Sequence, residues 1–318
     1  MLAEPFRSYS ILSICTLALG TGVLLQVSDS QAQNDEASGP KATWSRELGV
    51  GGEYDTNVSV SEVDLSSGES DYAFTSDFEL GVKRPLGETI KASASYSVSQ
   101  SRYGEFSRVD RLTQIAGANI DKDFGNANGS LSVYFIDSKL ANDGFLEFLR
   151  VSPALSGFVS KRWFLRGAYV YSERTIDDRP ERDAQTVTGE IDAYYFHRGL
   201  RSYMNLGLRY RNEDTGAPEL DFSGQAIKLR YIRRFDALGR QGKFEAAMRF
   251  EERDYRSPEP TIGEKRRDDR LRWKFDLELP LSKAIALQAY YSYGDFDSNL
   301  PRADFFQTIV GTRLQISW

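Results

Sequence analysis

The chain has 318 residues, with 40 Lys+Arg against 46 Asp+Glu, one His, one Cys and 13% aromatic residues. A formal net charge of -6 argues against a strongly basic nucleic-acid binder. Seventeen Tyr and 19 Phe are a heavy aromatic load for a polar chain and are typical of membrane β-barrels.

The N-terminus resembles an export signal in its residue pattern. Arg7 supplies a basic start, residues 11–25 form an apolar run, and Ser30-Gln31-Ala32 places small residues at the −3 and −1 positions of a cleavage site. We therefore predict a signal peptide over residues 1–32. The alternative is a transmembrane anchor, but the run is short for the roughly 20 residues that a span needs.

The only cysteine, Cys15, lies inside this apolar run and reads as a small hydrophobic residue. Residues 33–43 are polar, contain Gly39-Pro40, and predict a periplasmic lead-in without a domain of its own. The exported chain would then carry no thiol, disulfide or thiolate metal site.

From residue 44 to residue 318 the dominant hydrophobic period is two. In residues 271–279, Leu271, Trp273 and Phe275 share one face with two further leucines, while Arg272, Lys274, Asp276 and Glu278 share the other. A strand puts those four charges on one side, whereas a helix would scatter them. Such alternation in segments of about ten residues predicts strands with one face in lipid and one in a lumen.

We expect an all-β, antiparallel, up-and-down transmembrane barrel over residues 44–318 with fourteen strands, twelve to sixteen being the range that uncertain boundaries allow. The expected strands are 44–55, 71–84, 89–103, 109–122, 129–140, 146–160, 163–174, 185–197, 201–212, 220–234, 243–254, 268–280, 283–294 and 304–318. Short connections alternate with longer, charged ones such as 56–70 and 255–267. Outer-membrane barrels have short periplasmic turns and longer external loops.

Aromatic residues fall near the predicted strand ends, where girdles at the two membrane interfaces are expected. The periplasmic set is Trp44, Trp163, Phe196, Phe235 and Trp318, and the external set is Tyr54, Tyr72, Tyr103, Tyr171, Tyr210, Tyr293 and Phe306. A soluble β-sandwich would also alternate, but it would not need fourteen strands, two aromatic belts and alternating loop lengths.

Two short motifs resemble parts of known outer-membrane proteins. The C-terminal Leu314, Ile316 and Trp318 resemble the signal read by the barrel-assembly machinery. Residues 51–58, GGEYDTNV, resemble the opening of barrels in the surface lipoprotein assembly modifier family. That resemblance implies a fourteen-stranded barrel and a role in moving lipoproteins to the cell surface, although no part of this sequence matches the family's periplasmic tetratricopeptide domain.

The lumen-facing charges are predicted to gather on two walls of the barrel. The acidic wall comprises Glu47, Glu53, Asp77 and Glu79, and the basic wall comprises Arg209, Arg211, Lys228, Arg230, Arg249, Arg272 and Lys274. One interpretation is a transverse field across a wet pore that attracts anionic solutes. The other is pairing between neighbours, with Glu245, Glu251, Asp276 and Glu278 each neutralising a cation.

We interpret the charged residues of the long connections as solvated. These include Glu213, Asp214 and the pairs Asp177-Asp178 and Asp268-Asp269. The segment from Arg253 to Arg270 could cover the mouth or bind lipopolysaccharide phosphates through Arg266 and Arg267, but a solvated external loop is the simpler account.

The sequence predicts no enzyme and no cofactor, since its single histidine, His197, is expected at a periplasmic turn beside cations. The leading functional hypothesis is a porin-like channel or export conduit in the outer membrane for polar or anionic substrates. The alternative is a non-conducting barrel scaffold, or a partner in surface lipoprotein or polysaccharide export. Expected partners are outer-membrane lipid, lipopolysaccharide, the barrel-assembly machinery and a periplasmic export partner, but not nucleic acid.

Overall fold

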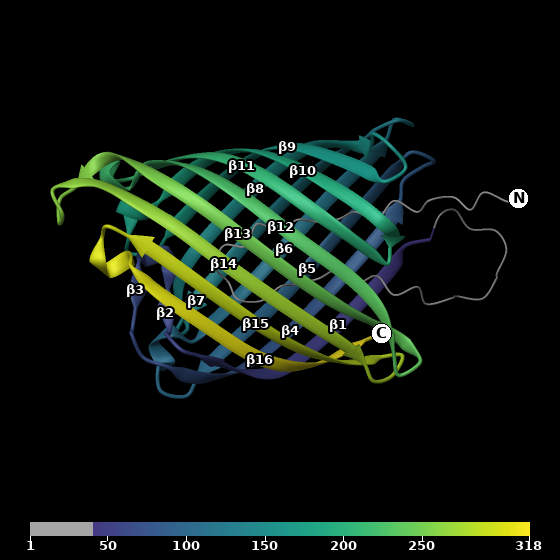
Figure 1. Cartoon of the computed structure of the whole chain (residues 1–318), viewed down its shortest axis with the longest axis horizontal. Helices are drawn as coiled ribbons and strands as arrows, with labels where there is room; N and C mark the ends of the chain where they lie inside the picture. The colour runs from purple at the N-terminus through teal and green to yellow at the C-terminus, as the bar shows by residue number, and fades with distance from the viewer. Residues whose placement is uncertain (1–40) are drawn as a thin grey trace, which may run out of the picture. The chain divides into compact units, whose positions relative to one another are not determined.

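The computed structural model describes residues 41–318 (Figure 1). The predicted signal peptide and all but the end of the lead-in lie outside the described residues. Fourteen long strands make up the barrel: β1 (Thr43–Asp55), β4 (Asp71–Pro85), β5 (Ile90–Tyr103), β6 (Arg111–Asp123), β7 (Asn128–Leu140), β8 (Asp143–Phe158), β9 (Trp163–Ile176), β10 (Ala184–Leu200), β11 (Ser202–Thr215), β12 (Phe222–Ala237), β13 (Arg240–Glu259), β14 (Glu264–Pro280), β15 (Ile285–Ser298) and β16 (Phe305–Ser317).

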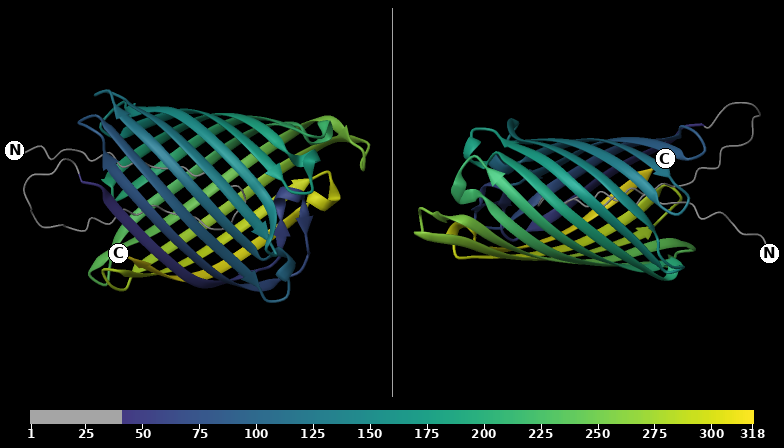
Figure 2. Two further views of the ribbon diagram at one scale, coloured as in Figure 1. Left: turned by 180° about the vertical axis from the view of Figure 1, so that it is seen from behind. Right: turned by 90° about the horizontal axis from the view of Figure 1, so that it is seen from above.

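Each strand pairs antiparallel with its neighbours in sequence, and β1 pairs with β16 to close the barrel (Figure 2). The seam is continuous from Glu47 opposite Ser317 to Asp55 opposite Ile309, and the Trp318 amide donates to the Arg46 carbonyl at 3.1 Å. Closure leaves no strand edge to expose unpaired backbone groups to lipid. The predicted fold class and strand count are confirmed.

Alternate residues of each strand face opposite sides of the barrel wall, as the period of two requires. On β10, Ile191 is 61% exposed on the outside, whereas its neighbours Glu190 and Asp192 are each 2% exposed on the inside. Exposed Leu206, Leu208 and other large apolar residues continue this band around the barrel. So much contiguous apolar surface on the outside is what a lipid-facing wall requires.

Most of the predicted girdle aromatics face outward, but two do not. Phe196 is buried on the lumen side of β10, and Tyr103 points into the lumen, where its hydroxyl donates to Asp55 at 3.2 Å. Both assignments were wrong because successive residues of a strand face opposite sides. An error of one position near a strand end therefore reverses the face that is assigned to a side chain.

The barrel end that we identify as external carries the longer connections. Here lie the short strands β2 (Ser59–Val60) and β3 (Leu65–Ser66), and the 3₁₀ turns η1 (Ser61–Val63), η2 (Ser107–Val109), η3 (Pro180–Arg182), η4 (Pro218–Leu220) and η5 (Pro301–Ala303). The predicted loop 255–267 is instead a continuation of β13 and β14, joined by residues 260–263 and projecting as the green hairpin in Figure 1. No helix within residues 41–318 is long and apolar enough to cross a membrane.

Candidate functional site

Residues 56–70, which we call the lid, connect β1 to β4 at the external end and fold inward. Asn57 holds the base of the lid together: its side-chain oxygen accepts hydrogen bonds from Ser66 at 2.7 Å and Gly68 at 2.9 Å. Its amide nitrogen donates to the Phe306 carbonyl at 2.9 Å. The Asp-Thr-Asn motif therefore holds both ends of the lid against β1 and β16, the two strands that close the barrel.

The tip of the lid packs against the far wall of the barrel. Val60 and Val63 form an apolar cluster with Phe145 and Leu146 of β8 and Ile176 of β9. In the closed strand order, β9 is six strands from β1, almost opposite on the ring. The lid thus crosses the external mouth, and burial of these side chains stabilises the crossing by roughly 1.5–3 kcal/mol per fully buried large residue.

Two carboxylates of the lid form ion pairs with the barrel. Glu62 pairs with Arg111 of β6 at 2.8 Å. Asp64 accepts from Arg182 of η3 at 2.9 Å and from both terminal nitrogens of Arg266 on β14 at 2.9 and 3.0 Å. Charge-assisted pairs of this kind are about twice as strong as neutral hydrogen bonds. The lid is consequently fixed to three separate parts of the wall.

The pKa values of these two carboxyl groups lie below their ordinary range. Burial by itself would raise the pKa of Glu62, but the charge and hydrogen bonds of Arg111 more than offset it. For Asp64 the same burial effect is outweighed by Arg266 and Arg182, which lower the pKa strongly. Both groups are therefore ionised at neutral pH, and docking of the lid favours their ionised form.

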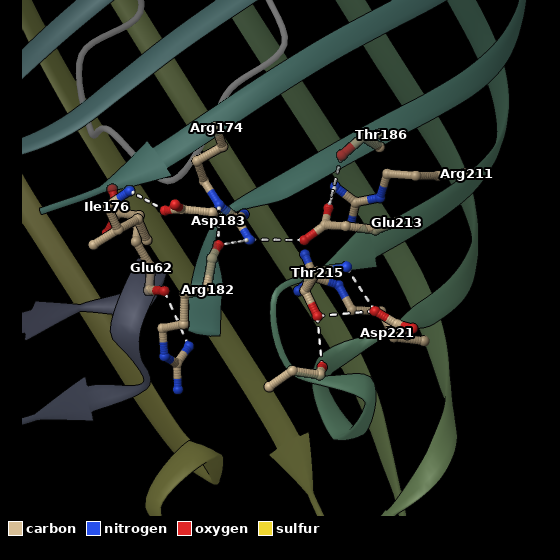
Figure 3. A network of polar contacts seen from close by, with 12 residues as sticks. Glu62, Arg174, Ile176, Arg182, Asp183, Thr186, Arg211, Glu213, Thr215 and Asp221 are labelled. Carbon is tan, nitrogen blue, oxygen red and sulfur yellow. Dashed lines mark hydrogen bonds and ion pairs between the residues drawn. The ribbon is translucent and has the colours of Figure 1, made fainter. Parts of the chain in front are cut away.

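A chain of polar contacts leads from the lid into the wall (Figure 3). Arg182 donates to the Glu62 carbonyl at 3.1 Å, and Arg174 donates to the Arg182 carbonyl at 3.1 Å. Arg174 also pairs with Glu213 at 2.9 Å, and Arg211 joins Glu213 to Glu251. Glu213 is 4% exposed, so its prediction as a solvated loop charge was wrong.

Arg266 and Asp268 were also predicted to be solvated, and both are buried. Arg266 is 1% exposed and donates to Asp268 at 2.7 and 2.9 Å as well as to Asp64. It cannot offer its guanidinium to lipopolysaccharide while these contacts last. The neighbouring Arg267 and Asp269 are exposed on the opposite face.

The predicted basic wall faces the lumen, and six of its seven members form ion pairs. Arg230 pairs with Glu245 at 2.5 Å, Lys228 with Asp192 at 3.1 Å, and Lys274 with Asp276 at 3.5 Å. The other three pairs are Arg209 with Glu190, Arg211 with Glu251 and Arg249 with Glu251. Neighbour pairing, the second of the two interpretations, describes most of this wall.

Arg272 differs from the other members of the basic wall. It lies directly opposite Arg249 in the β13–β14 register, and its guanidinium stacks over Phe296 at 5.0 Å from the ring centroid. Among the described residues no carboxylate lies within ion-pair distance of it. Arg270, two residues earlier, stacks over the same ring at 5.7 Å.

The predicted acidic wall also faces the lumen. Asp77 pairs with Arg313 at 2.8 Å, and Glu53 accepts from the Tyr290 hydroxyl at 2.7 Å. Glu47 and Glu79 lie directly opposite each other on β1 and β4. The walls are not diametrically opposed throughout, since only β15 and β16 separate β14 from β1 in the strand order.

The periplasmic half of the lumen holds an aromatic cluster that the sequence did not reveal. Phe196 of β10 lies 5.9 Å from Phe158, 6.4 Å from Tyr194 and 5.3 Å from Tyr203 between ring centroids. Tyr194 is 1% exposed. The pattern of alternate residues could have located these rings, because they share a face with Glu190 and Asp192.

The remaining sequence candidates lie at the periplasmic end. His197 is exposed on β10. Leu314 of β16 and Trp318, directly after that strand, are exposed at the seam, with Ile316 partly exposed between them. Within residues 41–318 no group of three or more His, Cys, Asp or Glu residues is arranged to hold a metal ion.

These features define a porin-like β-barrel of the outer membrane, closed by fourteen strands and with a charged lumen. Among solved structures, the chain is similar to OmpT of Vibrio cholerae (TM-score 0.53, 9% identity, 90% of this chain and 100% of that one). It is also similar to an OmpT variant lacking loop L8 (0.52, 8%, 88% and 100%) and to an anion-selective porin from Comamonas acidovorans (0.49, 10%, 88% and 100%). The OmpT likenesses show a shared fold. No family model and no curated protein matches the sequence.

Proposed function

We propose that this barrel is a gated channel for polar, anionic solutes and that the lid closes its external mouth. The observation that carries the proposal is the lid itself, which crosses the mouth from β1 to β8 and β9 and docks through ion pairs. A permanently open channel does not require a lid docked across its mouth. A non-conducting barrel does not require a polar interior beneath that lid.

The lumen-facing charges support a water-filled interior. Buried charge without a partner costs several kcal/mol, and the guanidinium of Arg272 forms no ion pair among the described residues: it stacks on Phe296 beside other arginines, with Glu251 beyond ion-pair distance. Water in the lumen removes most of that cost. A wet lumen is the condition for conduction.

A local surplus of positive charge in the ion-pair network on the β6, β9, β11, β13 and β14 side of the mouth supports anions as the solute class. The ion pairs around the mouth join eight arginines to five carboxylates: Arg111, Arg174, Arg182, Arg211, Arg249, Arg253, Arg266 and Arg270 to Glu62, Asp64, Glu213, Glu251 and Asp268. Arg272 adds one more cation beside them. A basic surplus with apolar walls around it raises the local concentration of anions.

Planar-bilayer recording of the refolded protein tests the proposal. We expect rare openings from the wild type and steady steps with anion preference from a variant in which residues 59–67 are replaced by a Gly/Ser linker. The linker variant keeps Asn57 and all fourteen barrel strands, so insertion can be checked in both proteins. A linker variant that inserts but never conducts would overturn the proposal.

The docked lid and the paired wall charges also favour a second function, a closed barrel that serves as a scaffold or export partner. The resemblance of residues 51–58 to surface lipoprotein assembly modifier barrels supports surface lipoprotein export as this function. Polysaccharide export is the other candidate. A silent linker variant would select this second function, and crosslinking from the periplasmic turns would then identify the partner. Contacts with lipopolysaccharide and with the assembly machinery stay predictions.

A further inference from the structure

The geometry points to a carboxylate-binding site at the external mouth, formed by Arg182, Arg266 and Arg270, in which Asp64 is the resident ligand and a carboxylate-bearing solute replaces it. The inference deepens the proposed function, on which it rests, by naming the solute class and the site where the solute is first bound. Exchange of one carboxylate for another would release the lid.

The cradle around Asp64 has the form of a built anion site. Arg266 presents two terminal nitrogens to the two carboxylate oxygens at 2.9 and 3.0 Å. Arg182 adds a third donor at 2.9 Å, and Arg270 lies 3.8 Å away. A planar guanidinium that binds both oxygens of one carboxylate recognises that group by shape as well as charge.

The barrel wall holds two arginines of this cradle, Arg266 and Arg270, in place without help from the lid, whereas among the described residues the side chain of Arg182 forms hydrogen bonds only with the lid. Asp268 accepts from Arg266 at 2.7 and 2.9 Å and from Arg270 at 2.8 Å. Asp268 is itself held by the Ser298 hydroxyl at 2.7 Å and the Tyr255 hydroxyl at 3.2 Å. When Asp64 leaves, Arg266 and Arg270 therefore stay oriented, and a preorganised site binds its ligand at a lower entropic cost.

Departure of Asp64 would leave the cradle short of negative charge. Two wall arginines, Arg266 and Arg270, would then share the single carboxylate of Asp268. The Nε of Arg270 is already buried without a hydrogen-bond partner. Such a site favours an anion from solution, because removing one partner of a buried ion pair leaves the other charge uncompensated.

Arg272 extends the site toward the lumen. Its guanidinium and that of Arg270 stack over the same ring, Phe296, at 5.0 and 5.7 Å. A solute with a second carboxylate could bind Arg272 after the first has displaced Asp64. Dicarboxylates should therefore act at lower concentrations than monocarboxylates.

The test measures the position of the lid by pulsed electron spin resonance with spin labels at Leu65→Cys, next to Asp64, and at Lys265→Cys, in the full chain carrying Cys15→Ala. Both label positions are exposed, one on the lid and one on β14. Succinate is the probe, acetate the monocarboxylate comparison, and chloride at equal ionic strength the control. A second pair, Lys265→Cys with the exposed Gln185→Cys, reports on the wall alone.

We expect succinate to shift the Leu65–Lys265 distance to longer values while chloride and the wall pair show no change. Glu62→Gln removes a docking contact without touching the cradle, so it should lower the succinate concentration for half-displacement roughly tenfold. Asp64→Asn should show the longer distance before succinate is added. In each variant, the unchanged wall pair establishes that the barrel is folded.

A lid distance that ignores succinate in the wild type and in Glu62→Gln would overturn the inference. Because the readout needs no ion flow, it separates the two claims. Lid displacement by succinate in a protein that never conducts would support the carboxylate site and reject the channel. Conduction in a protein whose lid distance does not respond to succinate would support the channel and reject the carboxylate site.

Discussion

At the scale of single residues, the buried charges of the mouth carry most of the information about function. Asp64 has a left-handed backbone conformation, with φ 53° and ψ 41°, at the turn between η1 and β3. Asp and Asn adopt that region more readily than other non-glycine residues. The same residue thus shapes the tip of the lid and supplies the carboxylate that docks it.

The lid should open as the solution becomes acidic. Both lid carboxyl groups have pKa values below their ordinary range when docked, Glu62 through Arg111 and Asp64 through Arg266. A lowered pKa stabilises docking above the ordinary values of about 4, and the stabilisation is lost as the pH falls through the docked values. The charged groups that face the two carboxylates are Arg111, Arg174, Arg182, Arg266, Asp268 and Arg270.

Bilayer open probability measured from neutral pH down to about 3 checks this prediction, the lower limit lying just below the ordinary carboxyl values. We expect a rise below about 4 in the wild type. The linker variant that lacks residues 59–67 is the control and should show no comparable rise. Equal pH profiles for the two proteins would show that titration elsewhere in the lumen is responsible.

A second prediction at this scale concerns close packing inside the lumen. The Tyr290 ring lies over Gly311 on the adjacent strand, and its hydroxyl donates to Glu53 at 2.7 Å. A Cβ on Gly311 would overlap that ring. Gly311→Ala should therefore displace Tyr290 and destabilise the barrel by roughly 1–3 kcal/mol.

Urea unfolding in detergent, followed by tryptophan fluorescence, measures the effect. Gly189→Ala is the matched control, because a Cβ there meets no atom within 4 Å. Equal midpoints for the two alanine variants would contradict the packing argument.

At the scale of elements, the base of the lid is held together by a single residue, Asn57. Asn57 makes three side-chain hydrogen bonds, to Ser66, Gly68 and Phe306. Asn57→Ala removes all three, each worth about 1 kcal/mol. We expect protease cleavage within residues 58–69 to become faster and the open probability to rise.

Limited proteolysis followed by mass spectrometry checks the Asn57 prediction. Ser70→Ala changes an exposed residue at the end of the same segment and serves as the control. Unchanged cleavage in Asn57→Ala would place the stability of the lid in its ion pairs and apolar tip alone.

The hairpin of β13 and β14 is an element for which a highly charged composition led to a wrong prediction. Its charged sequence was predicted to be a solvated loop, yet opposite charges face each other across the pair, Arg253 with Asp268 and Asp254 with Arg267. Residues 266, 268 and 270 are buried and residues 267 and 269 exposed, so the period of two continues in charged residues alone.

At the scale of the whole molecule, the distribution of charge should set ion selectivity. Arg272 forms no ion pair with a described carboxylate, so its neutralisation leaves none unpaired. Arg272→Gln in the linker variant should shift the reversal potential in a salt gradient away from anions. Arg267→Gln, on the exposed face of the same strand, is the control and should leave the potential unchanged.

The sequence by itself determined the barrel and its fourteen strands. It could do so because the lipid-facing pattern is local: each strand shows its own period of two, and antiparallel neighbours in sequence are neighbours in space. The predicted lumen side of Arg230, Asp77 and the other wall residues followed from the same pattern.

Only the tertiary structure decided what happens at the mouth. The lid has no periodic pattern, and its partners Arg111, Arg182 and Arg266 are 49, 118 and 202 residues away from the groups they bind. Whether a charge is solvated or paired depends on which distant element closes over it. That depends on the closed ring of strands, which brings β6, η3 and β14 around one opening.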